Sequence, residues 1–162
     1  MSSSKHVLGT LLLFFLSSVQ AEEKLLVIDV KRMTTEAALV MAKAALEACR
    51  KKGVQVGVTV VDRAARPQVV LRDVHAPDLT LDISRGKAHT AANFVVSTRE
   101  LAKNKTASSL PGVVAAGGGL PITAGGTLLG AIGVAGAPSA VMDEACAQAG
   151  IDSLIEELEM VD

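Results

Sequence analysis

The chain has 162 residues and nearly balanced charges, with 16 Lys and Arg against 17 Asp and Glu and a formal net charge of −1. This balance gives no sign of the basic face that a phosphate backbone requires, so the composition disfavours nucleic-acid binding. Aromatic residues make up only 2%, with no Trp or Tyr. Any ligand pocket must therefore be walled by aliphatic side chains and backbone rather than by stacked rings.

The N-terminal segment has the pattern of a cleaved secretory signal. Lys5 and His6 precede an apolar run at 7–16, and small residues follow up to Ala21. The run is too short to span a bilayer comfortably, and the alternative is an uncleaved interfacial anchor. We expect residues 1–21 to be removed and residues 22–162 to form one domain of a periplasmic or secreted protein, with no membrane association after cleavage.

The two cysteines have two possible states in an oxidising compartment. Cys49 falls on the apolar stripe of a predicted helix and Cys146 on the last predicted helix, so both are expected to face the core. A disulfide requires Cα atoms within about 7 Å of each other, and the sequence does not give this separation. It leaves the pairing open and slightly favours two buried thiols.

Capping residues and β-branched runs define the first half of the domain. Thr34 is expected to cap a long helix that ends at Gly53 after basic residues. The expected elements, in chain order, are a possible edge strand at 25–30, a helix at 36–52, a strand at 54–61, a turn at 62–66 and a strand at 68–72.

The second half is punctuated by glycine clusters at short intervals, which favour a tight antiparallel meander. The expected elements are a helix at 78–95, a helical turn at 97–103, strands near 112–115, 120–123 and 128–135, and a helix at 140–158 capped by Ser139. Hairpin-length links between the strands predict an α+β fold, with a central antiparallel sheet of about five strands flanked by helices.

The helix predicted in the middle of the chain carries the side chains of most chemical interest. Lys87 lies beside an apolar stripe, where a lysine either snorkels to solvent or binds an anion at the lip of a pocket. His89 shares the far side with Arg85 and Asn93. It could ligate a metal or haem iron, or it could simply be solvated or lie in a subunit contact, and the spacing alone favours these last two alternatives. His75, in the loop before this helix, is better placed to move onto a ligand.

Several common catalytic patterns are missing from the sequence. There is no P-loop, no nucleophile elbow and no pair of cysteines separated by two residues. With two histidines in the chain after residue 21, a His-rich zinc site is also disfavoured.

Short motifs in a specific order cover nearly all of the chain after the signal segment: VVD at 60–62, Arg72, GKAHTA at 86–91, Thr98, GGLPI at 118–122, GAIGVAG at 130–136 and Asp143-Glu144. In this order and spacing they resemble the GlcG/HbpS family, which includes haem-binding secreted proteins and the C-terminal domain of PduO-type proteins. The resemblance implies a profilin-like α+β domain, homo-oligomers from dimers to octamers, and haem or tetrapyrrole binding in some members. This sequence departs from the family at Ala65, where a glycine is usual, and at His75, where an imidazole has been gained.

The leading hypothesis from this resemblance is a periplasmic or secreted haem-binding protein rather than an enzyme. A slot between the flank of the lysine-bearing helix and the glycine-rich hairpins would take the macrocycle. The candidate residues are Arg72, Arg85 or Lys87 for the propionates, and His75, His89 or Thr98 for the iron, with the histidines ranked above Thr98.

Two other hypotheses stay open. One is an enzyme or accessory protein that acts on a small carboxylate metabolite, with Lys87 as an anion anchor and Asp62 as a possible base. The other is a structural homo-oligomer without a ligand, in which the glycine-rich edge is a subunit contact.

Overall fold

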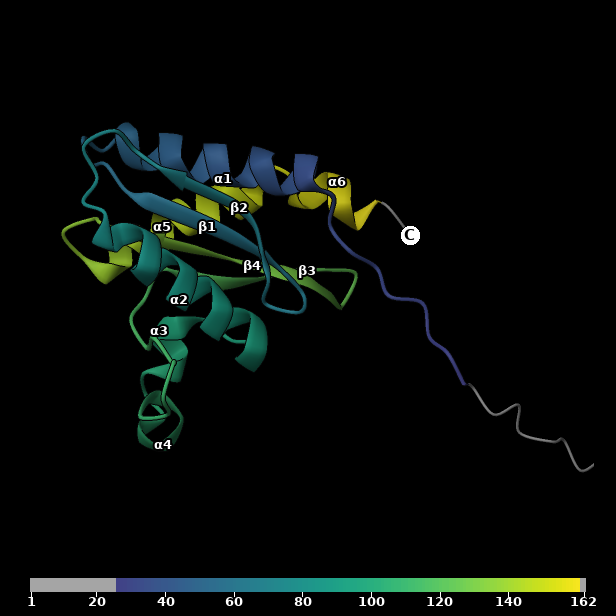
Figure 1. Ribbon diagram of the computed structural model, residues 1–162. Helices are drawn as coiled ribbons and strands as arrows, with labels where there is room; N and C mark the ends of the chain where they lie inside the picture. The colour runs from purple at the N-terminus through teal and green to yellow at the C-terminus, as the bar shows by residue number, and fades with distance from the viewer. Residues whose placement is uncertain (1–25, 161–162) are drawn as a thin grey trace, which may run out of the picture.

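The structure, a computed structural model, describes residues 26–160, so the predicted signal segment at 1–21 lies outside the described residues. Within them, four antiparallel strands form one sheet in the order β2-β1-β4-β3 (Figure 1). The strands are β1 (Gly57–Asp62), β2 (Pro67–Arg72), β3 (Gly119–Ala124) and β4 (Thr127–Ala135). The predicted α+β fold is confirmed, with four strands in this part of the chain instead of about five.

Helices cover both faces of the sheet (Figure 1). α1 (Thr35–Arg50) and α5 (Ala140–Asp152) lie side by side on one face, and α2 (Leu79–Phe94) lies on the other. The short helices are α3 (Thr98–Leu101), α4 (Lys105–Ser108) and α6 (Ile155–Glu159). No helix within residues 26–160 is long and apolar enough to cross a membrane.

The core has two parts, one on each side of the sheet, because successive side chains of a strand point to opposite faces. Val58 and Val60 of β1 pack with α1 and α5 in the larger part. Val61 packs in the smaller part, where the α2 residues are alanines (Ala88, Ala91 and Ala92). These small side chains let α2 approach the sheet closely.

Two of the predicted strands do not form. Near 112–115, Gly112 lies in a turn with φ +81°, and Val114 donates its backbone N–H to Thr90 Oγ1 of α2 at 3.0 Å, so this backbone bonds to a helix side chain rather than to a strand. The edge strand predicted at 25–30 is wrong for residues 26–30, which form no strand and run away from the body of the domain (Figure 1).

The predicted helix starts are confirmed by side-chain caps. Thr34 Oγ1 accepts from Ala37 N at the start of α1, and Ser139 Oγ accepts from Met142 N at the start of α5, both at 3.2 Å. The single last helix predicted at 140–158 is instead two helices. Leu154, with φ −145°, leaves the helical conformation between α5 and α6.

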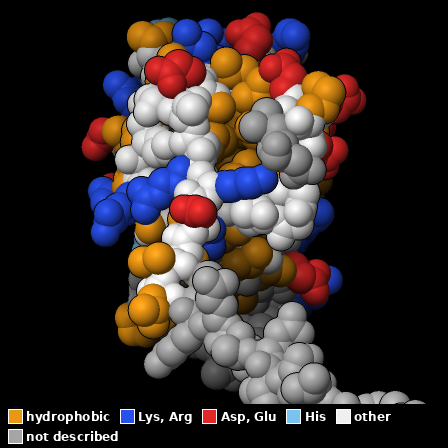
Figure 2. Space-filling model, turned by 90° about the vertical axis from the view of Figure 1, so that its right-hand side faces the viewer, with side chains coloured by type: hydrophobic (Ala, Val, Ile, Leu, Met, Phe, Trp, Pro, Cys, Tyr) orange, Lys and Arg blue, Asp and Glu red, His pale blue; other side chains and the backbone are white. Residues whose placement is uncertain are grey.

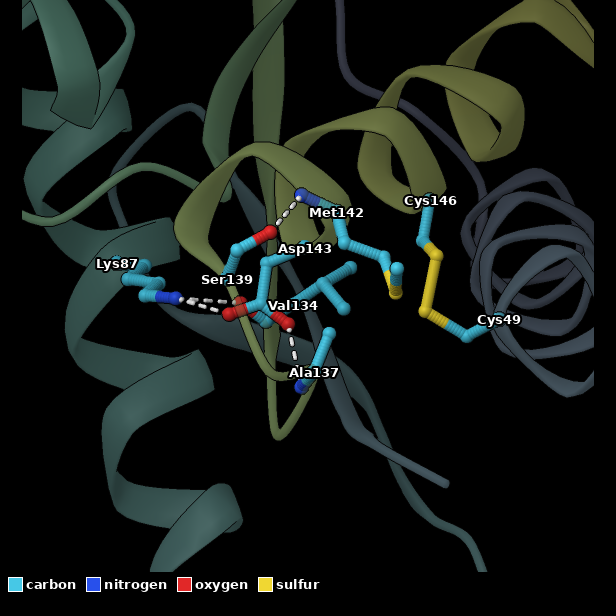
Figure 3. Close-up of a disulfide and its surroundings, with 8 residues drawn as sticks. All are labelled: Cys49, Lys87, Val134, Ala137, Ser139, Met142, Asp143 and Cys146. Atoms are coloured by element: carbon cyan, nitrogen blue, oxygen red, sulfur yellow. Dashed lines mark hydrogen bonds and ion pairs between the residues drawn. A yellow bond between two sulfur atoms is a disulfide. The ribbon is translucent and has the colours of Figure 1, made fainter. Parts of the chain in front are cut away.

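Cys49 and Cys146 form a disulfide between α1 and α5, with Cα atoms 5.6 Å apart (Figure 3). The slight preference for two buried thiols was therefore wrong. The two helices approach closely because small residues lie between them, and a Cβ at Gly150 would lie only 2.7 Å from Met41 O. The bridge is fully buried in the larger core.

The turn between β1 and β2 forms although Ala65 stands where a glycine was expected. Asp62 Oδ1 accepts from the N–H groups of Ala64 and Arg66, both at 2.9 Å. Ala65 adopts φ +60°, a left-handed conformation that costs a non-glycine residue roughly 1–2 kcal/mol. The hydrogen bonds of Asp62 hold the turn against this cost.

Candidate functional site

Glycines bring α2 into direct contact with the sheet at the place where the sequence predicted a ligand slot. A Cβ at Gly133 of β4 would lie 2.1 Å from Ser84 O, and a Cβ at Gly119 of β3 would lie 2.6 Å from Lys87 O. The two surfaces therefore pack backbone against backbone, at the density of a protein interior. The prediction of an open slot between α2 and these strands is wrong.

Lys87 lies buried in this contact rather than at the lip of a pocket (Figure 3). Its Nζ is 2.7 Å from Asp143 Oδ2 of α5 and donates to Val134 O at 2.9 Å, while Asp143 Oδ1 accepts from Ala137 N at 2.9 Å. The two charged side chains are only 4% and 6% exposed. Buried charges persist when they are paired and hydrogen-bonded, so the ammonium of Lys87 joins α2 to the start of α5 and is not free to anchor an anion.

Thr98 is also committed to the protein interior. Its Oγ1 donates to Ala116 O at 2.6 Å and accepts from Gly119 N at 2.9 Å. The next residue, Arg99, forms an ion pair with Glu144 of α5. These contacts attach α3 to the glycine-rich segment and to α5, and the fully buried Thr98 has no exposed surface to offer a ligand.

Arg85 and His89 lie one turn apart on the exposed side of α2, as predicted. Asn93 Nδ2 lies 3.3 Å from His89 Nε2 and donates to His89 O at 2.8 Å. Arg85 forms no ion pair with any residue that the structure describes. The outer face of α2 thus presents an accessible imidazole beside an uncommitted guanidinium.

Arg72 and His75 lie at and just after the end of β2, where internal bonds hold the loop. Arg72 Nη1 donates to Ala76 O at 2.5 Å, and His75 N donates to Gln55 Oε1 at 2.7 Å. The imidazole of His75 is exposed, but the backbone that carries it is fixed and the guanidinium of Arg72 is engaged. This loop is less free to move onto a ligand than the sequence suggested.

Asp73 fixes the same loop to α1. Arg50 donates to both of its carboxylate oxygens, from Nε at 2.8 Å and from Nη2 at 3.0 Å, and the carboxylate is 2% exposed. The hydrogen bonds from Arg50 hold the pKa of Asp73 below its ordinary value, although burial acts in the opposite direction. The pKa of Arg50 is raised, chiefly by the same hydrogen bonds.

His75 and His89 lie toward opposite ends of α2. His75 precedes the first residue of α2, Leu79, and His89 lies ten residues beyond Leu79, which is about 15 Å along the helix axis. Within residues 26–160 there is also no cluster of three or more His, Cys, Asp or Glu residues that could hold a metal ion. Each imidazole is therefore a separate candidate.

Asp62 was predicted as a possible base, but its carboxylate is hydrogen-bonded within the β1–β2 turn. Its Oδ1 accepts the two backbone bonds described above, and its Oδ2 lies 3.8 Å from Arg32 Nη1. With Lys87 paired to Asp143, the carboxylate-metabolite hypothesis lacks both the free anchor and the free base that it named.

A cavity of about 360 Å³ opens at a different place, at the end of the molecule that Figure 2 faces. Hydrophobic side chains lie in the hollow, with Lys and Arg side chains beside it. Its lining comes from the segment before α1, the start of α1, the β3–β4 turn and α6: Lys31, Arg32, Met33, Thr34, Ala37, Ala124, Gly125, Leu129 and Leu158. No local pattern predicted this cavity, because its walls are far apart along the chain.

The fold and these contacts define a class of protein, an α+β domain with an antiparallel sheet between α2 and the disulfide-linked pair α1 and α5. A model of the family described as haem degrading protein HbpS-like matches residues 33–152. This match covers most of the chain, and the protein therefore belongs to the HbpS-like family.

Solved structures agree with this assignment. A double mutant of HbpS from Streptomyces reticuli is 40% identical, with a TM-score of 0.76 over 84% of this chain and 95% of that chain. Klebsiella pneumoniae protein ORFY is 26% identical, with a TM-score of 0.75 over 83% and 97%. PduOC, solved in complex with haem, is 27% identical, with a TM-score of 0.70 over 76% and 95%. A search of the curated proteins found no match.

Proposed function

We propose that this protein is an exported haem-binding protein. The observation that carries the proposal is the family match over residues 33–152, together with a relative whose structure was solved with haem bound. Export is supported by two independent features. The N-terminal sequence has the pattern of a cleaved signal, and the buried Cys49–Cys146 disulfide is a bond that persists in oxidising compartments.

The outer face of α2 is the haem-binding surface that the contacts favour. His89 supplies an exposed imidazole, the ordinary haem ligand, and Arg85 lies one turn away with its guanidinium uncommitted among the described residues. Coordination through His89 Nε2 requires only the release of its contact with Asn93, which lies on the exposed side of the helix. Haem bound there would supply a porphyrin iron to which the imidazole bonds, while Arg85 would pair with a propionate.

His75 and Arg72 form the less favoured pair for a specific reason. The guanidinium of Arg72 already donates to Ala76 O, so a propionate would have to displace a bond that holds the loop. Lys87 and Thr98 are disfavoured more strongly because both are buried and hydrogen-bonded within the protein.

A haem titration of residues 22–162, followed by the Soret band, tests the proposal. We expect saturable binding at micromolar haem, at least about tenfold weaker binding in His89→Ala, and a smaller loss in Arg85→Ala. His75→Ala is the matched control, because it removes the other exposed imidazole and should leave the affinity unchanged. No saturable Soret shift would refute the proposal, and an effect of His75→Ala alone would move the site to the β2–α2 loop. Loss of the Soret band with time under reductant and oxygen would distinguish degradation from storage.

A further inference from the structure

The residues before α1 form an apolar arm that makes little contact with its own domain. Leu26, Val27 and Ile28 are 80%, 83% and 74% exposed, and Val30 is 42% exposed. Three of the five residues at 26–30 are β-branched, which favours an extended backbone. A run of large apolar side chains at such exposure is the mark of a surface that another molecule covers.

The cavity described above lies directly beside the base of this arm. Its interior is aliphatic, formed by Met33, Ala37, Leu129 and Leu158, and its rim carries Lys31 and Arg32. The side chain of Arg32 is 57% exposed, and its contact to Asp62 is 3.8 Å long. The site is therefore apolar inside, with the exposed guanidinium of Arg32 at its edge.

The arm matches this site in both respects. Its apolar side chains suit the aliphatic interior, and its single charged residue, Asp29, is opposite in sign to Arg32 at the rim. Alternate side chains of an extended segment point to opposite sides, so Leu26 and Ile28 can enter the hollow together while neighbouring residues stay near the rim.

The arm cannot easily fill the cavity of its own chain. Lys31, Arg32 and Met33, which follow the arm directly, form one wall of that cavity, so the arm would have to reverse direction within a few residues. Of the residue types that favour such a reversal, Gly, Pro, Asn, Asp and Ser, residues 22–33 contain only Asp29. In Figure 1 the arm instead runs away from the domain.

We propose that the arm at 26–30 of one copy occupies this cavity in a second copy, and that the exchange is reciprocal. A two-fold interface of this kind uses the same two surfaces on both partners, so each arm fills one cavity and each cavity receives one arm. The inference is independent of haem, because neither the arm nor the cavity includes the outer face of α2.

Molecular mass in solution, measured without haem, tests the exchange. Residues 22–162 should form a dimer or a multiple of it, and the mass should fall twofold in a form that begins at Lys31 and in Leu26→Asp/Ile28→Asp. Val141→Asp is the matched control, because Val141 is 61% exposed on α5 and lies outside both surfaces. The arm variants should have the same melting temperature as the parent protein when the parent is diluted until its arms dissociate, because the arm makes little contact with its own domain. An unchanged mass in the arm variants, or a monomeric parent protein, would overturn the proposal.

A cross-link locates the arm. One preparation carries Ile28→Cys and another Ala124→Cys, and after mixing we expect a reducible heterodimer between them. If arm deletion lowers the mass but the mixture of cysteine variants yields no such cross-link, the arm binds elsewhere and the cavity is overturned as its site. Binding of a fatty-acid probe to the parent protein with no change in its mass would assign the cavity to a small amphiphile instead.

Discussion

Lys87 and Asp143, 56 positions apart in the chain, form a buried ion pair of 2.7 Å that fixes α2 to the start of α5. Because Asp143 also accepts from Ala137 N, and Lys87 also donates to Val134 O, the pair organises the end of β4 as well. A buried charge without a partner destabilises the folded state far more than the buried pair does.

Removing Lys87 should therefore destabilise the protein strongly. We expect Lys87→Met to lower the free energy of unfolding by roughly 3–5 kcal/mol, because Asp143 then stays buried without a countercharge. Lys87→Met/Asp143→Asn should recover much of this loss, since the amide keeps an acceptor for Ala137 N. Urea unfolding measures both variants. The control is Lys103→Met, which breaks an exposed pair with Glu100 and should change stability by less than about 1 kcal/mol; equal losses at the two lysines would contradict the prediction.

The Cys49–Cys146 bond should stabilise the protein by lowering the conformational entropy of the unfolded chain. It joins residues 97 positions apart, and closing a loop of about 100 residues corresponds to roughly 4–5 kcal/mol in the chain-entropy account. We expect Cys49→Ala/Cys146→Ala to lose about 2–5 kcal/mol in urea unfolding. Reductant should shift the midpoint of the parent protein and leave that of the double variant in place. A parent midpoint that is insensitive to complete reduction would rule out this contribution.

Stability should fall in acid through Asp73. Its pKa is lowered in the folded protein by Arg50, so the interaction is fully present above the unfolded pKa of about 3.9 and is lost as the pH falls through the folded value. The difference in stability between the parent and Asp73→Asn should therefore be constant from neutral pH to about pH 5 and shrink below about pH 4. Urea midpoints across this range measure it. Val141→Ala, which changes an exposed side chain of α5 that does not titrate, should show no such trend.

Gly133 should tolerate no side chain. A Cβ there would lie 2.1 Å from Ser84 O and 2.6 Å from Ala88 N, so Gly133→Ala must push α2 off the sheet at an expected loss of about 3 kcal/mol or more. Gly112→Ala is the control, because no atom lies within 4 Å of its Cβ and only the φ of +81° is penalised, by roughly 1–2 kcal/mol. Thermal unfolding of the two variants should separate them clearly. Similar melting temperatures would argue against the close α2–sheet contact.

The sequence predicted the elements whose signals are local. Thr34 and Ser139 cap their helices as expected, because an N-cap depends on residues three positions apart. The apolar run near 112–115 resembles a strand in composition, yet its backbone finds a partner in Thr90 of α2, and no local pattern encodes that choice. The break at Leu154, which divides the predicted last helix into α5 and α6, was also missed.

The candidate site was predictable only in part. His89 and Arg85 share an exposed helix face, and helical spacing alone gives that result. The spacing gives no indication that Lys87 is buried against Asp143, that Thr98 bonds to Gly119, or that Cys49 meets Cys146. Each of these contacts joins residues that only the three-dimensional packing brings together.

The disulfide also determines what a proteolytic nick would do to this protein. The excursion through α3 and α4 carries the exposed Lys103 and Lys105, and it lies between the two cysteines in the chain. A protease that cuts there produces two polypeptides that remain covalently attached through sulfur. The clipped molecule would run as one band in a non-reducing gel and separate into two fragments only after reduction, so a single non-reduced band would not by itself show an uncut backbone.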